Sequence, residues 1–242
     1  RRRRADRRAN YSRPGPMTAP DPDRASAAQA FYSRWAPGYD HLARHAPGVR
    51  RLRADLADAL DLGAGDTVVD VGCGTGATLP YLRERVGPEG RGVGVDFAPG
   101  AVTRARDRID RAGWSNVAVC RGDATRLPLR SADAVVATFL MGMLPDPPAT
   151  VRDWLDGLGP DRIALLDLAR SYRLPGRPCN PLFRLVVRAS APPGTADHHG
   201  TSPAHVLDRR VAAAHRTVLD ACTTTTHETR AGGFAYLSAG RR

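Results

Sequence analysis

The stretch VVDVGCGTGATLPYL, from Val68 to Leu82, decides the fold, because it places three glycines in five positions directly after an apolar run that carries an acid. Glycine lets a backbone turn sharply and come close to a ligand. The amide groups of such a turn, and of a helix that begins there, hold the polar atoms of a nucleotide-like molecule. We therefore predict a strand, a turn and a helix here, with a nucleotide-like cofactor against the turn.

The sequence on either side of this stretch repeats the same order of elements. Short β-branched runs alternate with helical stretches, which is typical of parallel strands joined by crossover helices. Two further runs flank Gly232 and Gly233 near the carboxyl end and have the chemistry of a hairpin. The expected strands are residues 67–71, 91–97, 117–123, 133–144, 162–169, 222–230 and 234–242. The predicted fold class is α/β, a Rossmann-like doubly wound sheet of seven strands with a C-terminal antiparallel hairpin.

Length and composition predict one domain with additions. A chain of 242 residues that is 42% apolar can bury one sizeable core. We expect a disordered basic tail at residues 1–25 and a single domain at 26–242, with N-terminal lid helices (26–62) and a Pro/Gly-rich insertion (171–202). One apolar stripe on the second part of the lid segment is expected to be core packing, and it consists of Val49, Leu52, Leu56 and Leu60.

The formal net charge of +11 would fit an acidic partner such as nucleic acid. All 36 basic residues are arginines, however, which is typical of a GC-rich genome, and residues 1–16 hold seven of them against one aspartate. Subtracting that +6 from +11 leaves only +5 from Met17 onward. We therefore expect no nucleic-acid partner.

Cysteine spacing and hydropathy argue against a membrane-spanning, metal-binding or disulfide-linked protein. The longest apolar run, Ala134–Leu144, has 11 residues, whereas a membrane-spanning helix needs about 20. The four cysteines stand far apart, without a C-x-x-C pair, at Cys73, Cys120, Cys179 and Cys222. This spacing predicts neither a metal site nor a disulfide framework. We expect a cytoplasmic monomer or homodimer with no transmembrane segment.

Three motifs together resemble the class I S-adenosylmethionine-dependent methyltransferases. Asp70 before Gly-x-Gly-x-Gly matches the first motif of that family. GVGVDFAPGAVTRAR, residues 92–106, is similar to the second, and CRGDATRLPL, residues 120–129, is similar to the third. The resemblance covers roughly residues 30–240. It implies S-adenosylmethionine as the cofactor and a methyltransferase activity.

The resemblance also assigns roles to individual residues. It implies that Asp96 binds the two ribose hydroxyls and that Phe97 lies beside the adenine. Asp123 would accept a hydrogen bond from the adenine amino group and Ala124 would offer its backbone NH, while Asp70 orients the amino end of the cofactor. The candidate cofactor-binding residues are Asp70, Gly72, Cys73, Gly74, Thr75, Gly76, Asp96, Phe97, Asp123, Ala124 and Thr138.

Within the family, residues 31–43 and 137–146 look most like the ubiquinone and menaquinone C-methyltransferases, the type 11 group. That similarity implies a small acceptor that is apolar or resembles a quinol or phenol. Many relatives carry a histidine near the position of Met143, and this chain has none there. Removal of a proton from such an acceptor would be the role of Tyr39 and His41, the catalytic candidates.

The sequence is compatible with other classes of function. Only the excess of basic over acidic residues favours an RNA or protein methyltransferase. A non-catalytic protein that binds S-adenosylmethionine would carry the same motifs. An NAD(P) oxidoreductase is the least favoured interpretation. Gly72, Gly74, Ala77 and Asp96 also satisfy the dinucleotide fingerprint, but a dehydrogenase has no use for the third motif.

Overall fold

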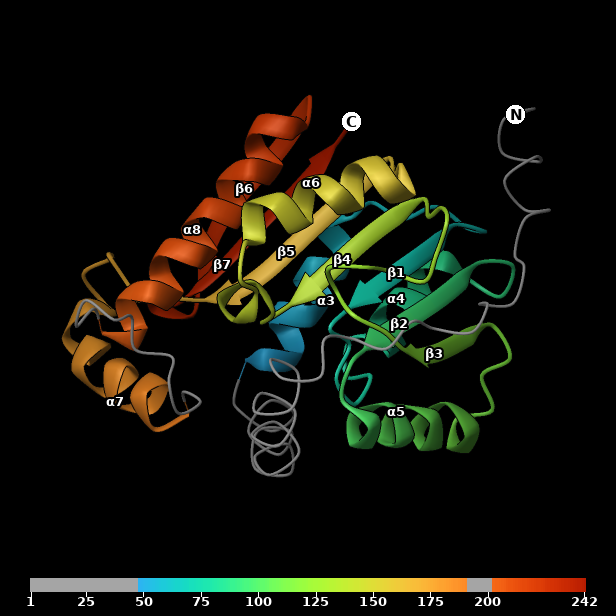
Figure 1. Cartoon of the computed structure of the whole chain (residues 1–242), viewed down its shortest axis with the longest axis horizontal. Helices are drawn as coiled ribbons and strands as arrows, with labels where there is room; N and C mark the ends of the chain where they lie inside the picture. The colour runs from blue at the N-terminus through green and yellow to red at the C-terminus, as the bar shows by residue number, and fades with distance from the viewer. Residues whose placement is uncertain (1–47, 191–201) are drawn as a thin grey trace.

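The structure is a computed structural model, and it describes residues 48–190 and 202–242 (Figure 1). The predicted tail at residues 1–25 lies outside the described residues. The same is true of the predicted lid segment up to residue 47, which includes Tyr39 and His41.

One seven-stranded sheet forms the centre of the molecule, in the order β3-β2-β1-β4-β5-β7-β6 (Figure 1). Its strands are β1 (Thr67–Val71), β2 (Arg91–Asp96), β3 (Val117–Arg121), β4 (Ala134–Thr138), β5 (Arg162–Leu168), β6 (Thr224–Arg230) and β7 (Ala235–Arg241). The first five strands pair in parallel, whereas β7 pairs antiparallel with both β5 and β6. This order confirms the predicted doubly wound sheet with a C-terminal antiparallel hairpin.

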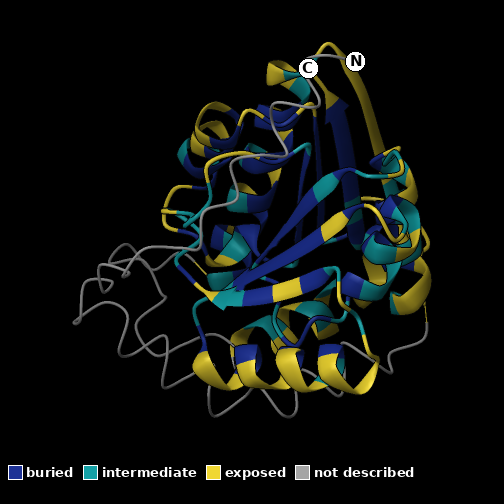
Figure 2. Cartoon of the chain, turned by 90° about the vertical axis from the view of Figure 1, so that its right-hand side faces the viewer, coloured by how far each residue is buried: buried dark blue, intermediate teal, exposed yellow. Residues whose placement is uncertain are grey.

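Helices cover both faces of the sheet (Figure 1). One face carries α3 (Val49–Ala59), α4 (Leu79–Val86) and α5 (Pro99–Arg111), and the other carries α6 (Pro147–Leu158) and α8 (Pro203–Ala221). Figure 2 shows buried central strands with exposed residues on the outer sides of the helices. Because both faces are covered, a central strand such as β4 has every residue from Ala134 to Ala137 buried.

The predicted apolar stripe of α3 packs into the core. Leu52, Leu56 and Leu60 are buried against the sheet, and Val49 at the start of the helix is half-buried. Arg53 is buried on the same helix. Helix α3 contacts β5, β7 and α4. It therefore forms part of the domain core.

The order of the strands places a switch point between β1 and β4. The chain builds outward from β1 through β2 to β3, then crosses back to add β4 on the other side of β1. The loops after β1 and β4 therefore leave in opposite directions, and an open α/β sheet binds its ligands at this position, beyond the carboxyl ends of the strands.

Two parts of the chain differ from the sequence prediction. The strand expected over residues 133–144 ends at Thr138, because Phe139 has a φ of 59° and turns the chain into the short 3₁₀ helix η1 (Met141–Met143). Helix α6 is absent from the elements expected from sequence. It begins where the Asp146 carboxylate accepts a hydrogen bond of 3.0 Å from the Ala149 backbone N–H.

The predicted insertion at residues 171–202 holds some regular structure. It contains the 3₁₀ helix η2 (Arg177–Cys179) and helix α7 (Asn180–Ser190), the segment expected to be helical. The short 3₁₀ helix η3 (Ala231–Gly233) joins β6 to β7, at the expected glycine pair. Among the described residues, no helix combines the length and the apolar character needed to cross a membrane.

Candidate functional site

The glycine-rich segment after β1 forms a tight turn over residues 72–76, called here the glycine turn. Gly72, Gly74 and Gly76 have positive φ angles of 69°, 56° and 73°, which side chains with a Cβ rarely adopt. A Cβ built on Gly74 would meet no atom within 4 Å, whereas one on Gly72 would lie 2.9 Å from Leu140 Cδ1. The backbone beside Gly74 is therefore accessible to a ligand, and Gly72 allows the segment after β4 to pack closely.

Asp96, at the end of β2, ties the glycine turn to the neighbouring strand. Its Oδ2 accepts a hydrogen bond of 2.8 Å from the Gly74 N–H, and its Oδ1 accepts one of 2.9 Å from the Ala98 N–H. Burial raises the pKa of the Asp96 carboxyl, and the backbone donors act in the opposite direction. Each carboxylate oxygen can accept a second hydrogen bond, so Asp96 keeps the capacity to bind hydroxyl groups.

Asp70, on β1, is fully buried, and neither of its carboxylate oxygens has a hydrogen-bond partner among the described residues. Burial raises the pKa of this carboxyl from 3.8 to about 8, with the positive charge of Arg53 lowering it and the negative charge of Asp96 raising it. A buried carboxylate without partners is costly for the fold. Such a group in an otherwise well-packed strand marks a binding position.

Arg53 and Phe139 lie close to one another beside this acid. Arg53 is buried on α3, and its guanidinium carbon lies 5.7 Å from the centroid of the Phe139 ring. Phe139 is the residue with positive φ that follows β4. A cation and an aromatic ring therefore stand near Asp70, on the face of the sheet covered by α3.

The threonines predicted from sequence are found in the same region. Thr138, the last residue of β4, has its Oγ1 3.3 Å from the Oγ1 of Thr78, which precedes α4. Thr75, in the glycine turn, is buried. Hydroxyl groups from two elements thus line the switch point between β1 and β4.

The segment after β3 forms a local turn that is fixed to α6. The Asp123 Oδ1 accepts hydrogen bonds of 2.8 and 2.9 Å from the backbone and side chain of Thr125. The Ala124 carbonyl accepts a 2.7 Å hydrogen bond from the indole N–H of Trp154. Within the described part of the chain, the backbone N–H of Ala124 and the Asp123 Oδ2 remain available at the carboxyl end of β3.

Cys73 belongs to the glycine turn through its backbone, while its thiol packs in an apolar cluster with side chains such as Leu79 and Val119. Burial raises the pKa of the Cys73 thiol well above its ordinary value, and the charges of Asp70 and Asp96 raise it further. The group is therefore a thiol at neutral pH and acts as packing, because nucleophilic chemistry requires the thiolate.

A buried polar chain fixes the segment after β4 to α8. The Asp167 Oδ1 accepts a 3.1 Å hydrogen bond from the Met141 N–H, and its Oδ2 lies 3.3 Å from the Nε2 of His215. The Ser238 Oγ lies 2.8 Å from the His215 Nδ1 and 2.7 Å from the Nδ1 of His227. Because Asp167 accepts at both oxygens, this chain holds η1 in place, and with it Leu140 against the glycine turn.

These residues fit a nucleoside that carries an amino group. The open backbone at Gly74 and the free lone pairs of Asp96 suit a ribose, and the turn at Asp123 and Ala124 offers an acceptor and a donor to a base. Asp70 supplies a buried carboxyl group that an ammonium beside it would ionise. The orphaned oxygens of Asp70 are the structural observation that calls for such a ligand.

Comparison with known proteins agrees with this geometry. Residues 68–161 match the model of a family described as "Methyltransferase domain". This matched segment contains the three motifs and their strands. Residues 68–161 are therefore similar to a methyltransferase domain, in agreement with the resemblance found in the sequence. The strand order confirms the predicted fold class.

Two curated methyltransferases are similar to the chain. It is 36% identical over 154 residues to nocamycin O-methyltransferase of Saccharothrix syringae, covering 62% of this chain and 55% of that protein. It is 33% identical over 146 residues to 2-phytyl-1,4-naphtoquinone methyltransferase of Thermosynechococcus vestitus, covering 58% of this chain and 64% of that protein. The chain thus spans a little over half to under two thirds of these relatives.

A solved structure supports the fold of the methyltransferase domain. A SAM-dependent methyltransferase from Aquifex aeolicus superposes with a TM-score of 0.56 at 20% identity, covering 80% of this chain and 92% of that one. At this identity the likeness concerns the fold alone.

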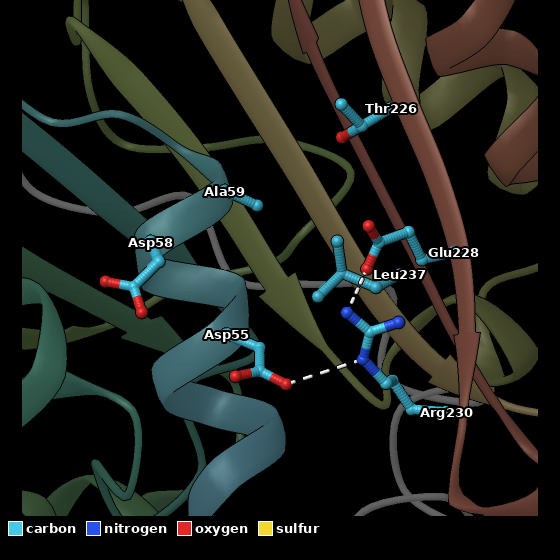
Figure 3. A pocket seen from close by; sticks show the side chains of 7 residues that line it. All are labelled: Asp55, Asp58, Ala59, Thr226, Glu228, Arg230 and Leu237. Atoms are coloured by element: carbon cyan, nitrogen blue, oxygen red, sulfur yellow. Dashed lines mark ion pairs between the residues drawn. The ribbon is translucent and has the colours of Figure 1, made fainter.

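A polar hollow lies away from the methyltransferase site, between α3 and β6 (Figure 3). Its volume is about 350 Å³, and it is lined by Asp55, Asp58, Ala59, Thr226, Glu228, Arg230 and Leu237. Arg230 forms ion pairs there with Glu228 and, at 3.6 Å, with Asp55. Three strands separate β6 from β1 in the sheet, so this hollow belongs to the sheet edge and plays no part in the site.

Sequence motifs predicted the residues of the methyltransferase site that lie at the strand ends, and missed the groups that support them. Arg53 carried a signal, because it falls within the apolar stripe of α3, where a charge is unexpected. Asp167 and His215 are 48 residues apart, and no local pattern connects them. Tyr39 and His41 lie outside the described residues and stay predictions.

Proposed function

We propose that the chain transfers a methyl group from S-adenosylmethionine to a small molecule that is apolar or resembles a quinol or phenol. The observation that carries this proposal is Asp70, a buried carboxyl without hydrogen-bond partners among the described residues, next to a glycine turn whose backbone is open at Gly74. An ammonium beside Asp70 would compensate its charge. The amino acid part of S-adenosylmethionine carries such a group.

The remaining residues have complementary roles in this proposal. Asp96 binds the ribose hydroxyls through the lone pairs that its backbone contacts leave free. Asp123 and Ala124 bind the adenine, with Phe97 beside it. The other proposed cofactor-binding residues are Gly72, Cys73, Gly74, Thr75, Gly76 and Thr138, where Cys73 contributes through its backbone.

The chemistry of the acceptor is inferred from the segments after β4 and β5. Met143 and Leu168 are exposed apolar side chains at these carboxyl ends, with 45% and 36% of their surface accessible. The two curated relatives are named for an O-methylated natural product and for a naphthoquinone. Both observations support an apolar acceptor of small size.

S-adenosylmethionine supplies a methyl group on a positively charged sulfur, and in-line attack by the acceptor transfers it. Because the donor is already activated, the residues of the protein mainly align the acceptor and exclude water. Leu140, packed over Gly72, and Met141, held by Asp167, fix the wall on one side. Tyr39 or His41 is proposed to take the proton from an acceptor hydroxyl.

The experiment that tests this proposal is incubation of the full chain with methyl-labelled S-adenosylmethionine and a panel of naphthoquinols, phenols and polyketide aromatics. Mass spectrometry of molecules that co-purify with the protein guides the choice of panel. Label in an acceptor with wild type, and its loss with Asp96→Ala but not with Asp107→Ala on the surface of α5, supports the proposal. Binding of NADH in competition with S-adenosylhomocysteine, with no methyl transfer, contradicts it.

A further inference from the structure

Large apolar side chains that are exposed in the described residues are confined to one part of the chain. They are Met143, Leu168, Tyr172, Leu174, Leu182, Leu185 and Val186. Single exposed apolar residues are normal on a protein, but a cluster of them marks an interaction site. The cluster is densest on α7, where Leu182 and Leu185 keep 64% and 62% of their surface accessible.

Helix α7 has two distinct apolar faces. Leu182, Leu185 and Val186 follow a spacing of three and four residues and form one exposed stripe. Phe183 lies on a different side of the helix, and its ring centroid lies 5.3 Å from that of Phe234. The inner face therefore anchors the helix on the domain, and the outer stripe, here called the α7 stripe, is exposed among the described residues.

The start of α7 is held by hydrogen bonds as well as by Phe183. The Asn180 side chain donates a 2.9 Å hydrogen bond to the Ser171 carbonyl and accepts a 3.0 Å hydrogen bond from the Ser171 N–H. The Ser171 Oγ in turn donates to the Gly232 carbonyl at 2.7 Å. These contacts fix the orientation of the helix, so exposure of the α7 stripe is a property of the fold.

The charged residues of α7 and of the segment before it are all positive. Residues 171–190 contain four arginines and no aspartate or glutamate, and all four arginines are exposed: Arg173, Arg177, Arg184 and Arg188. Helix α5 also exposes arginines, but it interleaves them with Asp107 and Asp110. Helix α5 therefore lacks the unmixed positive charge that accompanies the apolar stripe of α7.

This combination selects among the surfaces that could cover the stripe. In a symmetric dimer through this face, the four arginines of each copy would meet those of the other, and like charges oppose such a contact. A bilayer that contains anionic lipids offers apolar chains to the stripe and negative headgroups to the arginines. Amphipathic helices with arginine beside leucine and valine bind at this interface.

We propose that α7 docks the protein on the surface of an anionic lipid bilayer. Leu182, Leu185 and Val186 enter the region between headgroups and acyl chains, and Arg184 and Arg188 contact the headgroups. Helix α7 lies in the plane of the interface. Docking needs neither the methyl donor nor the acceptor, so it goes beyond the proposed function and can be tested without any activity.

Vesicle flotation with the full chain tests the proposal. Vesicles of equal parts phosphatidylglycerol and phosphatidylcholine are compared with vesicles of phosphatidylcholine alone, at about 0.1 M salt, where surface charges still act over roughly 10 Å. One variant, Leu182→Asp/Leu185→Asp, alters the stripe, and a second, Arg184→Glu/Arg188→Glu, reverses its charges. The matched control, Arg104→Glu/Arg111→Glu, makes the same charge change on α5, far from α7 (Figure 1). Thermal melting and size-exclusion chromatography of each variant establish that it is folded.

We expect wild type to float with the anionic vesicles and to bind phosphatidylcholine vesicles at least about tenfold more weakly. An arginine near such a surface contributes about fivefold in affinity, so the α7 charge variant loses at least about 25-fold while the α5 control stays within a few-fold of wild type. The leucine variant also loses at least about 25-fold, because each buried leucine contributes at least as much as one arginine.

Three results would overturn the proposal. The first is absence of wild-type flotation with anionic vesicles. The second is an equal loss for the α7 and α5 charge variants, which would show that basic residues bind lipid without regard to position. The third is a wild-type dimer that the leucine variant converts to a monomer while flotation is unchanged, which would assign the α7 stripe to a second copy.

Discussion

Replacement of Asp70 by asparagine separates the effect of this buried acid on the stability of the fold from its role in ligand binding. Asp70 is fully buried in β1, and burial raises the pKa of its carboxyl to about 8. In an unfolded chain the pKa of aspartate is about 3.9. The folded state therefore holds a proton that the unfolded state has released at every pH between these two values.

This difference in pKa fixes the sign and size of the effect on stability. Where the folded state binds more protons, the free energy of unfolding falls as the pH rises, here from about pH 4 to about pH 8. Each pH unit within that window costs about 1.4 kcal/mol, so Asp70 lowers stability by about 3 kcal/mol between pH 5 and pH 7. Asparagine does not titrate, and the variant lacks this slope.

Urea unfolding of both proteins at pH 5, 6 and 7 measures the effect. Burying the asparagine amide at this position has its own cost, but that cost does not depend on pH and cancels from the comparison. We expect the stability of Asp70→Asn relative to wild type to rise by about 3 kcal/mol from pH 5 to pH 7. Asp153→Asn, which removes an exposed carboxyl of α6, controls for the change in net charge. If the free energies of unfolding of wild type and Asp70→Asn changed in parallel with pH, the raised pKa assigned to Asp70 would be wrong.

The same substitution reports on the ligand. At pH 7 the ligand-free Asp70 is mostly protonated, and an ammonium beside it favours the ionised form. Binding of S-adenosylmethionine should then release close to one proton, which calorimetry in buffers of different ionisation enthalpy detects. Asp70→Asn should bind more weakly and release none. Release of the same number of protons by the variant would place the ammonium elsewhere.

Three further substitutions test how the site is held. Gly74→Ala should lower the free energy of unfolding by about 1 kcal/mol, because alanine disfavours the positive φ of this position. It should also weaken the binding of S-adenosylhomocysteine by at least tenfold in calorimetry, and unchanged affinity would mean that the ligand does not occupy the space beside Gly74. Trp154→Phe removes the hydrogen bond to Ala124 and should cost about 1 kcal/mol in urea unfolding with a several-fold loss of affinity, whereas full affinity would show that Ala124 is positioned without it. His215→Ala leaves Asp167 buried with one partner fewer and should cost about 2–4 kcal/mol, so wild-type stability would contradict the assigned contact.

The fold could be predicted from sequence because its local signals agree with one another. Strands covered on both faces appear as short apolar runs, and the glycines after Val71 mark where the first strand must turn. The glycine pair near the carboxyl end marks the hairpin. Each signal lies within about fifteen residues, so tertiary context was not needed to interpret it.

The errors of prediction have physical causes. The apolar run through Leu144 continues beyond the strand because Leu140, Met141 and Leu144 are buried in η1 and its flanks, and periodicity does not distinguish such runs. Helix α6 carries a start signal, Asp146 followed by two prolines. Pro145, Pro147 and Pro148 around Asp146 are equally typical of a turn, which hides the start of the helix.

The site was predictable only where its residues belong to local motifs. Asp70 and Asp96 stand at fixed positions around the glycine turn, and their proposed roles follow from a spacing along the chain. Arg53 comes from α3 and His215 from α8, and only the folded chain brings them near Asp70 and Asp167. Residues that support a site from distant elements leave no pattern in a single sequence.

Calorimetric titration of the full chain with S-adenosylhomocysteine tests cofactor binding and needs no knowledge of the acceptor. We expect saturable one-to-one binding by wild type, a loss of at least tenfold with Asp96→Ala, and binding within twofold of wild type for the exposed control Asp107→Ala. Absence of binding by the folded wild-type protein, or equal affinity for wild type and Asp96→Ala, would contradict this expectation.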